Sequence, residues 1–280
     1  MKLAAVVVLY HPDDQLLRNI RSYIGGVDLL MLWENSPLAD KEKIQNELAE
    51  YSGKIVFLGN GQNAGLGKAY NEAARYAKSA GYTHLMTMDQ DSCFVQFEGF
   101  RENIEKETDP KVKMQAPFFN QDKIYDEPPF EVRLAINSGA VFPLDLFDET
   151  GFFREDFFIG GIDVEFNHRL RKFGYKCVRY SNCNMYHTVG SCRYITMGRL
   201  KFEVTDYSPA RRFYCVKNEF ALYREYPNEY SFRDRWKFFL YQVKDIVKIL
   251  WKESNKKQKV NAILRGAWYG FRSIDKPYSS

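Results

Sequence analysis

The sequence predicts an α/β protein built on a mostly parallel central sheet with helices on its faces. Short apolar runs, typical of strands buried on both sides, alternate with segments that repeat apolar residues at helical spacing. Polar residues suited to ligand binding follow two of these runs, at Gly59–Asn71 and Asp89–Asp91. Ligands of such sheets bind beyond the carboxyl ends of the strands, so both segments are candidates for one site.

Four strands and three helices are expected in the first third of the chain. The apolar runs that predict the strands are Lys2–Tyr10, Leu29–Trp33, Lys54–Leu58 and Thr83–Met88. The first is almost wholly β-branched and apolar, as for a central strand. Apolar residues at helical spacing predict the three helices. They follow Asp13–Asp14, recur from Lys41 to Tyr51, and begin again within Gly59–Asn71. This βαβαβ order is typical of a doubly wound sheet.

The middle of the chain continues the alternation less regularly. Helices are expected at Phe97–Lys106, at a short turn over Asp145–Phe147 and from Ile162 onward, and strands at Lys113–Phe118, Leu134–Phe142 and Lys176–Tyr180. Gly139 interrupts the second of these strands, and a glycine there often marks close approach of a ligand or of another backbone. The polar segment Asn120–Pro129 is expected to be a mobile surface connection.

Asp89 and Asp91 form the strongest candidate for a metal site. Two carboxylates about 4 Å apart repel by roughly 1 kcal/mol in water and about 4 kcal/mol at an effective dielectric of 20. A hard cation such as Mg²⁺ or Mn²⁺, shared with phosphates of a substrate, relieves that repulsion. The alternatives are that both are solvated loop acids, or that one caps the next helix.

The glycine-rich segment Gly59–Asn71 joins a strand to a helix. Such a turn presents backbone N–H groups and a helix dipole to an anion. It is not a Walker loop, because Gln62 stands where a glycine should lie and Ala69 where Ser or Thr should follow Lys68. The alternative is a plain start of a helix with glycines in the left-handed conformation.

Asp163 and His187 are further candidates. Asp163 falls in the first turn of an expected helix, where the dipole favours the ionised carboxylate and a general base would be available. The alternative for Asp163 is a helix-favouring acid, and for His187 a core or surface residue without a ligand.

Cysteines and composition limit the class of protein. The five cysteines are odd in number and contain no Cys-x-x-Cys pair, which suits a reducing cytosol better than a disulfide framework. Cys177, Cys183, His187 and Cys192 lie near one another in sequence, but their gaps match no common zinc spacing. We expect no signal peptide, and no apolar run approaches the roughly 20 residues of a membrane span.

Charge is distributed unevenly along the chain. Residues 199–280 carry eighteen Lys and Arg against nine Asp and Glu, a net charge of +9, which leaves −5 for residues 1–198. An apolar stripe at helical spacing lies in the basic part, and it consists of Trp236, Phe239, Leu240, Val243, Ile246, Val247, Leu250 and Trp251. The stripe is expected either to pack against the rest of the protein or to lie on an anionic membrane, and nucleic acid is a poorer match.

Taken together, these segments resemble the large family of inverting, nucleotide-sugar-dependent glycosyltransferases with the GT-A fold, especially its bacterial rhamnosyltransferase branch. The matching segments are Val6–Pro12, Asn35–Ser36, Asn63–Asn71, Met88–Ser92, Phe157–Arg169, His187–Gly190 and Arg212–Asn218. Each motif alone is weak, whereas their order and spacing together are specific. Lys217 departs from the branch, which tends to have Arg there, and Lys68 stands where small residues are commoner.

The resemblance implies a GT-A catalytic domain at 1–205. The charge excess and the apolar stripe predict a basic, amphipathic helical region at 206–280, which lies mostly outside the resemblance. It implies that Asp89, Asp91 and His187 hold Mg²⁺ or Mn²⁺, that Asp163 is the catalytic base, and that Glu165 and Arg169 support it. The residues expected at the nucleotide sugar are Tyr10, Pro12, Asn35, Asn63, Gly65, Lys68, Asn71, Asp89, Gln90 and Gly139.

The resemblance also implies partners and a location. The favoured donor is dTDP-L-rhamnose, with a UDP- or GDP-sugar as alternative, and the acceptor is a glycan or a polyprenyl-linked sugar of a surface polysaccharide. We expect a cytoplasmic protein that is peripheral to the inner face of the membrane. Two rivals remain, a nucleotidyltransferase and a non-catalytic glycan-binding scaffold. The first usually has a basic glycine-rich loop after its first strand, where this chain has Tyr10–Asp13, and the second predicts loss of the three acidic residues, which are present.

Overall fold

The computed structural model describes residues 1–38, 41–120, 127–187, 193–197, 200–274 and 277–278. The described chain forms two compact units, one of residues 1–155 and 162–187 and one of residues 156–161 and 188–280. The first unit ends at residue 187, whereas the sequence suggested a boundary at residue 205. Most of the segment expected as a mobile connection, residues 121–126, lies outside the described residues.

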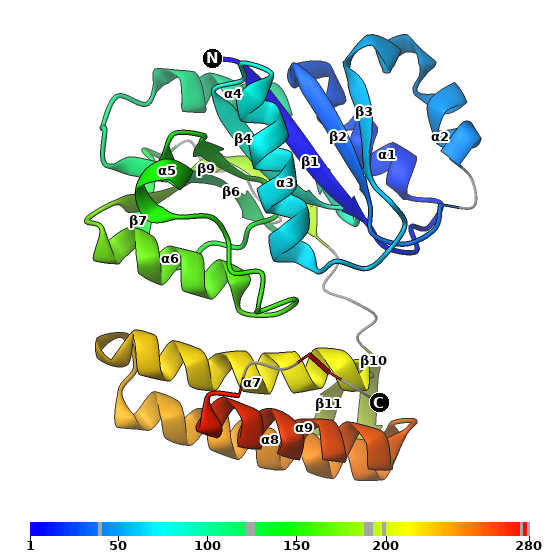
Figure 1. Cartoon of the computed structure of the whole chain (residues 1–280), viewed down its shortest axis with the longest axis vertical. Coiled ribbons are helices and arrows are strands. Elements are labelled where there is room, and N and C mark those ends of the chain that lie inside the picture. The colour runs from blue at the N-terminus through cyan, green and yellow to red at the C-terminus, as the bar shows by residue number, and fades with distance from the viewer. Residues whose placement is uncertain (39–40, 121–126, 188–192, 198–199, 275–276, 279–280) are drawn as a thin grey trace. The chain divides into compact units, whose positions relative to one another are not determined.

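The first unit is a mixed sheet covered by helices (Figure 1). Its strands are β1 (Leu3–Leu9), β2 (Leu29–Glu34), β3 (Ile55–Gly59), β4 (His84–Asp89), β5 (Ser92–Phe94), β6 (Val112–Phe119), β7 (Phe130–Val132), β8 (Ala140–Pro143) and β9 (Lys176–His187). Its helices are α1 (Leu16–Arg21), α2 (Lys41–Glu47), α3 (Leu66–Ser79), α4 (Phe97–Lys106), α5 (Leu146–Thr150) and α6 (Ile162–Lys172), with 3-10 turns at Ile24–Gly26 and Ala49–Lys54. The sheet order is β3-β2-β1-β4-β8-β6-β9-β5, with β7 paired to β9.

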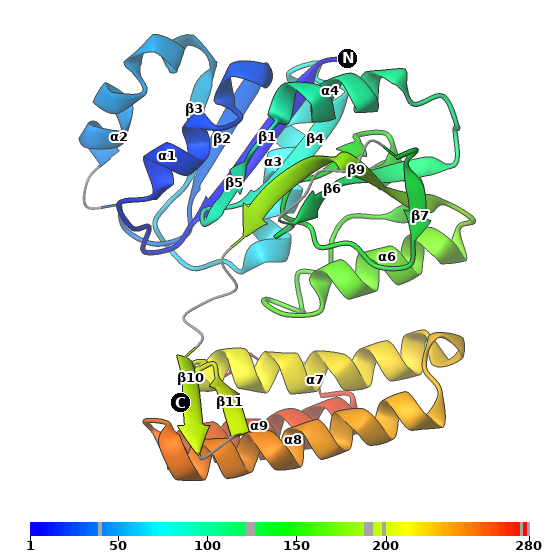
Figure 2. The same cartoon turned by 180° about the vertical axis from the view of Figure 1, so that it is seen from behind.

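The parallel half of the sheet confirms the predicted α/β class. β1 pairs in parallel with β2 on one side and β4 on the other, and all seven of its residues are buried. Helix α3 crosses one face in Figure 1, and α1 and α4 cross the other in Figure 2. Apolar side chains of β1, α1 and α4 share one core cluster, which includes Leu9, Ile20 and Phe100.

The antiparallel part of the sheet differs from the sequence prediction at three places. The strand predicted over residues 134–142, with an interruption at Asn137–Ala140, is shorter in the structure. Only Ala140–Pro143 is a strand, and Asn137–Gly139 form a turn that the Ala140 N–H closes onto the Asn137 carbonyl at 3.0 Å. β9 runs on to His187, well past the predicted end at Tyr180. β5 and β7 were not predicted, because three residues are too few to show an alternating pattern.

The second unit contains a β-hairpin and three helices. Its elements are β10 (Arg193–Met197), β11 (Leu200–Val204), α7 (Pro209–Glu225), a 3-10 turn at Pro227–Glu229, α8 (Phe232–Lys252) and α9 (Lys256–Arg272). α7 and α9 approach closely at two glycines, since a Cβ at Gly266 would lie 2.6 Å from the Phe213 carbonyl oxygen and one at Gly270 2.9 Å from that of Lys217. Within the described residues, no helix is both long enough and apolar enough to cross a membrane.

A buried network of charges joins the helices of the second unit. Arg212 on α7 is 4% exposed and binds Asp245 of α8 and, at 2.7 Å, the carboxylate of Glu253. Lys259 of α9 binds the same carboxylate at 2.9 Å and also pairs with Asp206. Buried charges are tolerated only when they are paired, so this network fixes the positions of the three helices relative to one another.

Candidate metal and transfer site

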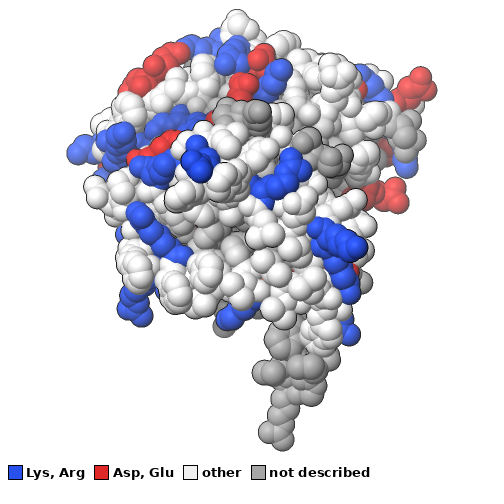
Figure 3. All heavy atoms as spheres, turned by 60° about the horizontal axis from the view of Figure 1, so that its bottom comes forward, with Lys and Arg blue, Asp and Glu red and all other residues white. Residues whose placement is uncertain are grey.

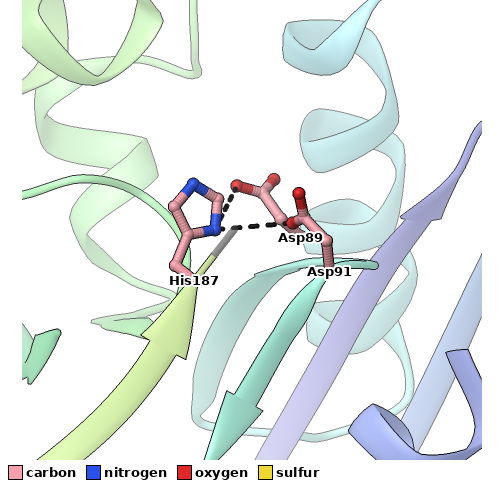
Figure 4. Close-up of side chains that lie close together, drawn as sticks. All are labelled: Asp89, Asp91 and His187. Atoms are coloured by element: carbon pink, nitrogen blue, oxygen red, sulfur yellow. Dashed lines mark ion pairs between the residues drawn. The ribbon is translucent and has the colours of Figure 1, made fainter. Parts of the chain in front are cut away.

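Asp89, Asp91 and His187 converge at one edge of the sheet in the first unit (Figure 4). The Nδ1 atom of His187 lies 3.4 Å from an oxygen of Asp91 and 3.9 Å from an oxygen of Asp89. All three side chains are partly buried, and one ligand atom from each lies within 4.8 Å of the others. The sequence prediction that these three residues come together is consistent with this geometry.

Strand pairing brings His187 to the two carboxylates. Asp89 ends β4, and the chain turns through Gln90 and Asp91 into β5. β5 pairs antiparallel with β9 in a register that sets Ser92 opposite His187. Sequence reasoning found the three polar residues but not this short strand, which is the element that determines their distance.

Two buried serine hydroxyls support the cluster. The Ser92 hydroxyl lies 2.9 Å from Nδ1 of His187 and 2.7 Å from the Ser138 hydroxyl. The Ser138 hydroxyl also accepts a hydrogen bond from the Asp89 backbone N–H at 3.0 Å. The two serines therefore orient both the imidazole and the chain that carries the carboxylates. They were not predicted as functional, because an isolated serine carries no spacing signal.

Gln90 holds the acidic turn against the end of β1. Its side chain accepts a hydrogen bond from the Tyr10 N–H at 2.8 Å and donates one to the Tyr10 carbonyl at 3.0 Å. Its backbone carbonyl accepts a third bond from Asn19 at 2.9 Å. These three bonds hold the turn that carries Asp89 and Asp91 in place, while the Tyr10 side chain stays exposed.

The chemistry of the donor set fits a divalent cation. Carboxylate oxygens suit Mg²⁺ and Mn²⁺, and one imidazole nitrogen is compatible with Mn²⁺. The Ser92 hydroxyl contacts Nδ1, which is also the ring nitrogen from which the distances to both acids are measured, and so fixes the orientation of the imidazole. This is the one group of three or more His, Cys, Asp or Glu with such spacing among the residues that the structure describes. The alternative zinc cluster is not supported there, although Cys192 lies outside the described residues.

Tyr70 of α3 lies beside the acidic residues and was not predicted as part of the site. Its hydroxyl is 3.5 Å from an oxygen of Asp89, and its ring packs on Phe153. Burial raises the pKa of Tyr70 well above its ordinary value, and the charges of Asp89 and Asp163 raise it further. Tyr70 thus remains a neutral hydrogen-bond donor next to Asp89 at every physiological pH.

Asp163 occupies the first turn of α6, as predicted. One of its oxygens accepts a hydrogen bond from the Val164 N–H at 2.9 Å. Burial nevertheless raises the pKa of Asp163, and the backbone hydrogen bonds oppose that rise only in part. Desolvation of the carboxylate therefore outweighs the helix terminus, on which the sequence interpretation relied. A raised pKa makes this carboxylate a stronger base than an exposed one.

Glu165 and Arg169 lie on α6 beyond Asp163. Glu165 is 2% exposed and forms an ion pair with Arg169 one helical turn later, with Nε of Arg169 at 3.0 Å from the carboxylate. Arg169 also donates to the carbonyls of Gly151 at 3.0 Å and Phe152 at 2.7 Å. Both side chains are thus engaged within the fold, and their part in supporting Asp163 stays a prediction.

Two predicted binding residues link the glycine-rich turn to β2. Asn35 donates to the Asn63 side chain at 3.1 Å and accepts from the Ala64 N–H at 2.8 Å. Asn63 also accepts from the Gly65 N–H at 3.1 Å, and Gly65 takes a φ of 81° at the start of α3. The amide groups of these asparagines shape the turn, which lies at the same sheet edge as the ends of β1 and β4.

The remaining predicted residues differ in exposure. Asn71 is buried and binds the backbone of Phe153 through both ends of its amide, at 2.9 and 3.0 Å. Pro12 is partly exposed and Lys68 is exposed. Gly139 has a φ of 77°, and a Cβ there would lie 2.9 Å from the sulfur of Met185. The group that approaches Gly139 closely in the structure is therefore the Met185 side chain.

No family model matches the sequence. The chain is 25% identical over 246 residues to a protein of Shigella flexneri named dTDP-rhamnosyl transferase RfbF, and the match covers 79% of each chain. A mannosyltransferase of Pyrobaculum calidifontis, solved with GDP-Man and Mn²⁺, matches 98% of this chain and 88% of its own at a TM-score of 0.60 and 10% identity. The fold of this chain is that of GT-A glycosyltransferases.

Two other solved structures share this GT-A fold. GalNAc-T7, solved with UDP, GalNAc and Mn²⁺, matches at a TM-score of 0.58 and 13% identity, and TarS of S. aureus at 0.54 and 13%. These matches cover 98% and 99% of this chain but only 56% and 44% of the two neighbours. The likeness to these structures therefore concerns the fold.

Proposed function

We propose that this GT-A glycosyltransferase transfers L-rhamnose from dTDP-L-rhamnose, with inversion and with a divalent metal ion, to a glycan or polyprenyl-linked acceptor. The observation that carries the donor is the similarity to the dTDP-rhamnosyl transferase of Shigella flexneri over 79% of the chain. The cluster of Asp89, Asp91 and His187 supports the metal requirement. The setting we propose is surface-polysaccharide assembly in the cytoplasm, at the inner face of the membrane.

In this proposal Asp89, Asp91 and His187 hold Mg²⁺ or Mn²⁺ at the donor diphosphate. The bound ion would supply Lewis-acid stabilisation of the negative charge on the departing nucleotide. Ser92 and Ser138 keep the three ligands in place, and Gln90 keeps the acidic turn against the end of β1, where the nucleotide is expected. The remaining predicted residues are proposed to line the donor site or to support its lining. They are Tyr10, Pro12, Asn35, Asn63, Gly65, Lys68, Asn71 and Gly139.

Asp163 is proposed as the general base. Its carboxylate takes the proton of the acceptor hydroxyl while that oxygen attacks the anomeric carbon and the bond from this carbon to the diphosphate oxygen breaks. One displacement inverts the anomeric centre, and dTDP leaves with the bonding electrons. The raised pKa of Asp163 supports this assignment, because it brings the base closer to the pH at which the enzyme works.

A donor screen tests the proposal. Thermal unfolding of the full chain is followed with dTDP-L-rhamnose, UDP-GlcNAc and GDP-Man, each with Mn²⁺, with Mg²⁺ or with EDTA. A ligand at about 100 times its Kd stabilises by roughly 2.7 kcal/mol, which is readily seen as a rise in unfolding temperature. We expect the largest rise for dTDP-L-rhamnose with metal. A larger rise for UDP-GlcNAc or GDP-Man would assign the donor to that nucleotide sugar, and no rise with any donor would contradict the proposal.

A further inference from the structure

Helix α8 exposes most of its apolar side chains. Only Asp245 and Ile249 of its 21 residues are buried, whereas Phe232 is 81%, Val247 59% and Leu250 55% exposed. With about 100° between successive residues, these exposed positions fall on one stripe beside the face that carries Ile249. The apolar stripe seen in the sequence is thus largely left uncovered within the second unit.

Helix α9 adds a second exposed stripe. Leu264 is 59%, Trp268 52% and Phe271 70% exposed, and they follow one another at i, i+4 and i+7. A groove of about 590 Å³ is lined by residues of α7, α8 and α9, including Phe239 of α8 and Leu264 and Phe271 of α9. Both stripes therefore border the same groove and form one apolar surface, named here the α8–α9 surface. It consists of Phe232, Trp236, Phe239, Leu240, Val243, Val247, Leu250, Trp251, Leu264, Trp268 and Phe271.

Basic side chains border the α8–α9 surface. Helical spacing puts Arg233, Lys237, Lys244 and Lys248 along one flank of the α8 stripe. Besides the buried Lys259, α9 contains four Lys and Arg and no acid, and of the two acids of α8 Asp245 is buried against Arg212. Figure 3 shows blue Lys and Arg side chains set among white ones on the face that it brings forward. A long apolar stripe flanked by cations is the pattern of a helix that lies in a membrane interface.

We propose that the α8–α9 surface docks on an anionic phospholipid bilayer, with its apolar side chains at the level of the headgroups and its cations against lipid phosphates. A second copy of the chain is the poorer occupant, because a two-fold contact through this surface would set the same cations against each other. The inference rests on the proposed function only for the lipid-linked acceptor. Vesicle binding needs neither donor nor acceptor, so the membrane docking and the proposed glycosyl transfer can be disproved independently of each other.

Sedimentation of the full chain with lipid vesicles tests this docking. We expect binding to vesicles of phosphatidylglycerol and phosphatidylcholine, weak binding to phosphatidylcholine alone, and release as salt rises. The variant Val247→Gln with Leu250→Gln should bind at least about tenfold more weakly. Lys244→Gln with Lys248→Gln should lose about fivefold for each lysine, and its residual binding should depend less on salt.

Matched controls separate docking from loss of structure. Phe173→Gln and Lys43→Gln change an exposed aromatic and an exposed lysine of the first unit and should bind vesicles as the wild type does. Circular dichroism and thermal unfolding of each variant verify the fold. Absence of binding to the anionic vesicles at low salt would overturn the proposal. So would equal binding by the Val247 and Leu250 variant, or a dimer in sedimentation velocity that this variant dissociates while vesicles do not bind.

Discussion

The Nδ1 atom of His187 lies 3.4 Å from a carboxylate oxygen of Asp91, although the two residues are far apart in the sequence. Asp91 directly precedes β5, and His187 is the last residue of β9. Without a cation, this histidine forms an ion pair with the two carboxylates only when the ring is protonated. A bound cation would instead need the neutral imidazole. The negative charge of the two acids can thus be compensated in two ways, by a protonated His187 or by a bound cation.

Loss of a ligand should weaken metal binding. We expect Asp91→Asn to abolish Mn²⁺ binding and His187→Ala to weaken it by about tenfold or more, because the first removes a charge and the second a neutral donor. Titration calorimetry measures both. His84→Ala changes a histidine at the opposite end of β4 and should bind Mn²⁺ normally. Unchanged affinity in Asp91→Asn would exclude this cluster as the metal site.

The hydroxyl of Ser92 should matter for the metal without contacting it. Ser92→Ala removes the bond to Nδ1 of His187 and to Ser138, and we expect metal affinity to fall by about 10- to 100-fold, as for other outer partners. Ser79→Ala, which changes an exposed hydroxyl at the end of α3, is the control. Equal affinities in the two variants would mean that the Ser92 hydroxyl has no orienting effect.

Asp163→Asn should separate catalysis from stability. We expect turnover to fall by about 10²- to 10⁴-fold while donor binding persists, because only proton transfer is lost. Burial raises the pKa of Asp163 above its ordinary 3.8, so stability from this group is present below pH 3.8 and lost as pH rises through the raised pKa. At neutral pH the variant should therefore unfold at the same temperature as the wild type or higher. Near-normal turnover would remove Asp163 from the base role.

The acid limb of the wild-type pH–rate profile should report the same carboxylate. Activity should decline as pH falls through the pKa of Asp163, at a pH above the ordinary carboxyl value of 3.8. The measurement is kcat/KM for the donor against pH at saturating metal, because this ratio reports the pKa of the donor-free enzyme. An acid limb at the ordinary value or below would contradict the burial of this group.

Alanine substitutions at Gly67 and Gly99 should change the free energy of unfolding in opposite directions. A Cβ at Gly67 would lie 2.4 Å from the carbonyl oxygen of Arg154, so Gly67→Ala should destabilise the protein by about 1 to 3 kcal/mol. Gly99 lies inside α4 with nothing within 4 Å of an added Cβ, and alanine there should stabilise by up to about 1 kcal/mol. Urea unfolding measures both. A neutral Gly67→Ala would show that the backbone of residue 154 moves away freely.

Glu253 should be the most sensitive member of the buried charge network. Glu253→Gln leaves Arg212 and Lys259 short of a negative partner, and we expect a loss of about 3 kcal/mol in the free energy of unfolding. Glu102→Gln, in an exposed pair with Lys106, should have no measurable effect. A small loss for Glu253→Gln would mean that Asp245 and Asp206 suffice to neutralise both cations.

Much of the fold was visible in the sequence because β1 to β4 and their helices carry long, regular patterns. The acidic pair was also visible, since it stands at the end of an apolar run, whereas His187 was assigned to the metal only through the resemblance to the family. β5 and β7 were not, because three-residue strands have no period and depend on partners distant in the chain. Tyr70, Ser92 and Ser138 were missed for a related reason. A single neutral residue forms no sequence pattern, and only its neighbours in the structure indicate that it belongs to the site.

The pairing of β5 with β9 also has a consequence for synthesis of the protein. Ser92 and His187 are 95 positions apart, so at about 5 to 20 residues per second the ribosome makes the histidine roughly 5 to 20 s after the serine. During that interval the nascent chain has Asp89 and Asp91 but not His187. A metal ion held by Asp89, Asp91 and His187 would therefore acquire its full set of protein ligands only near the end of translation of the first unit.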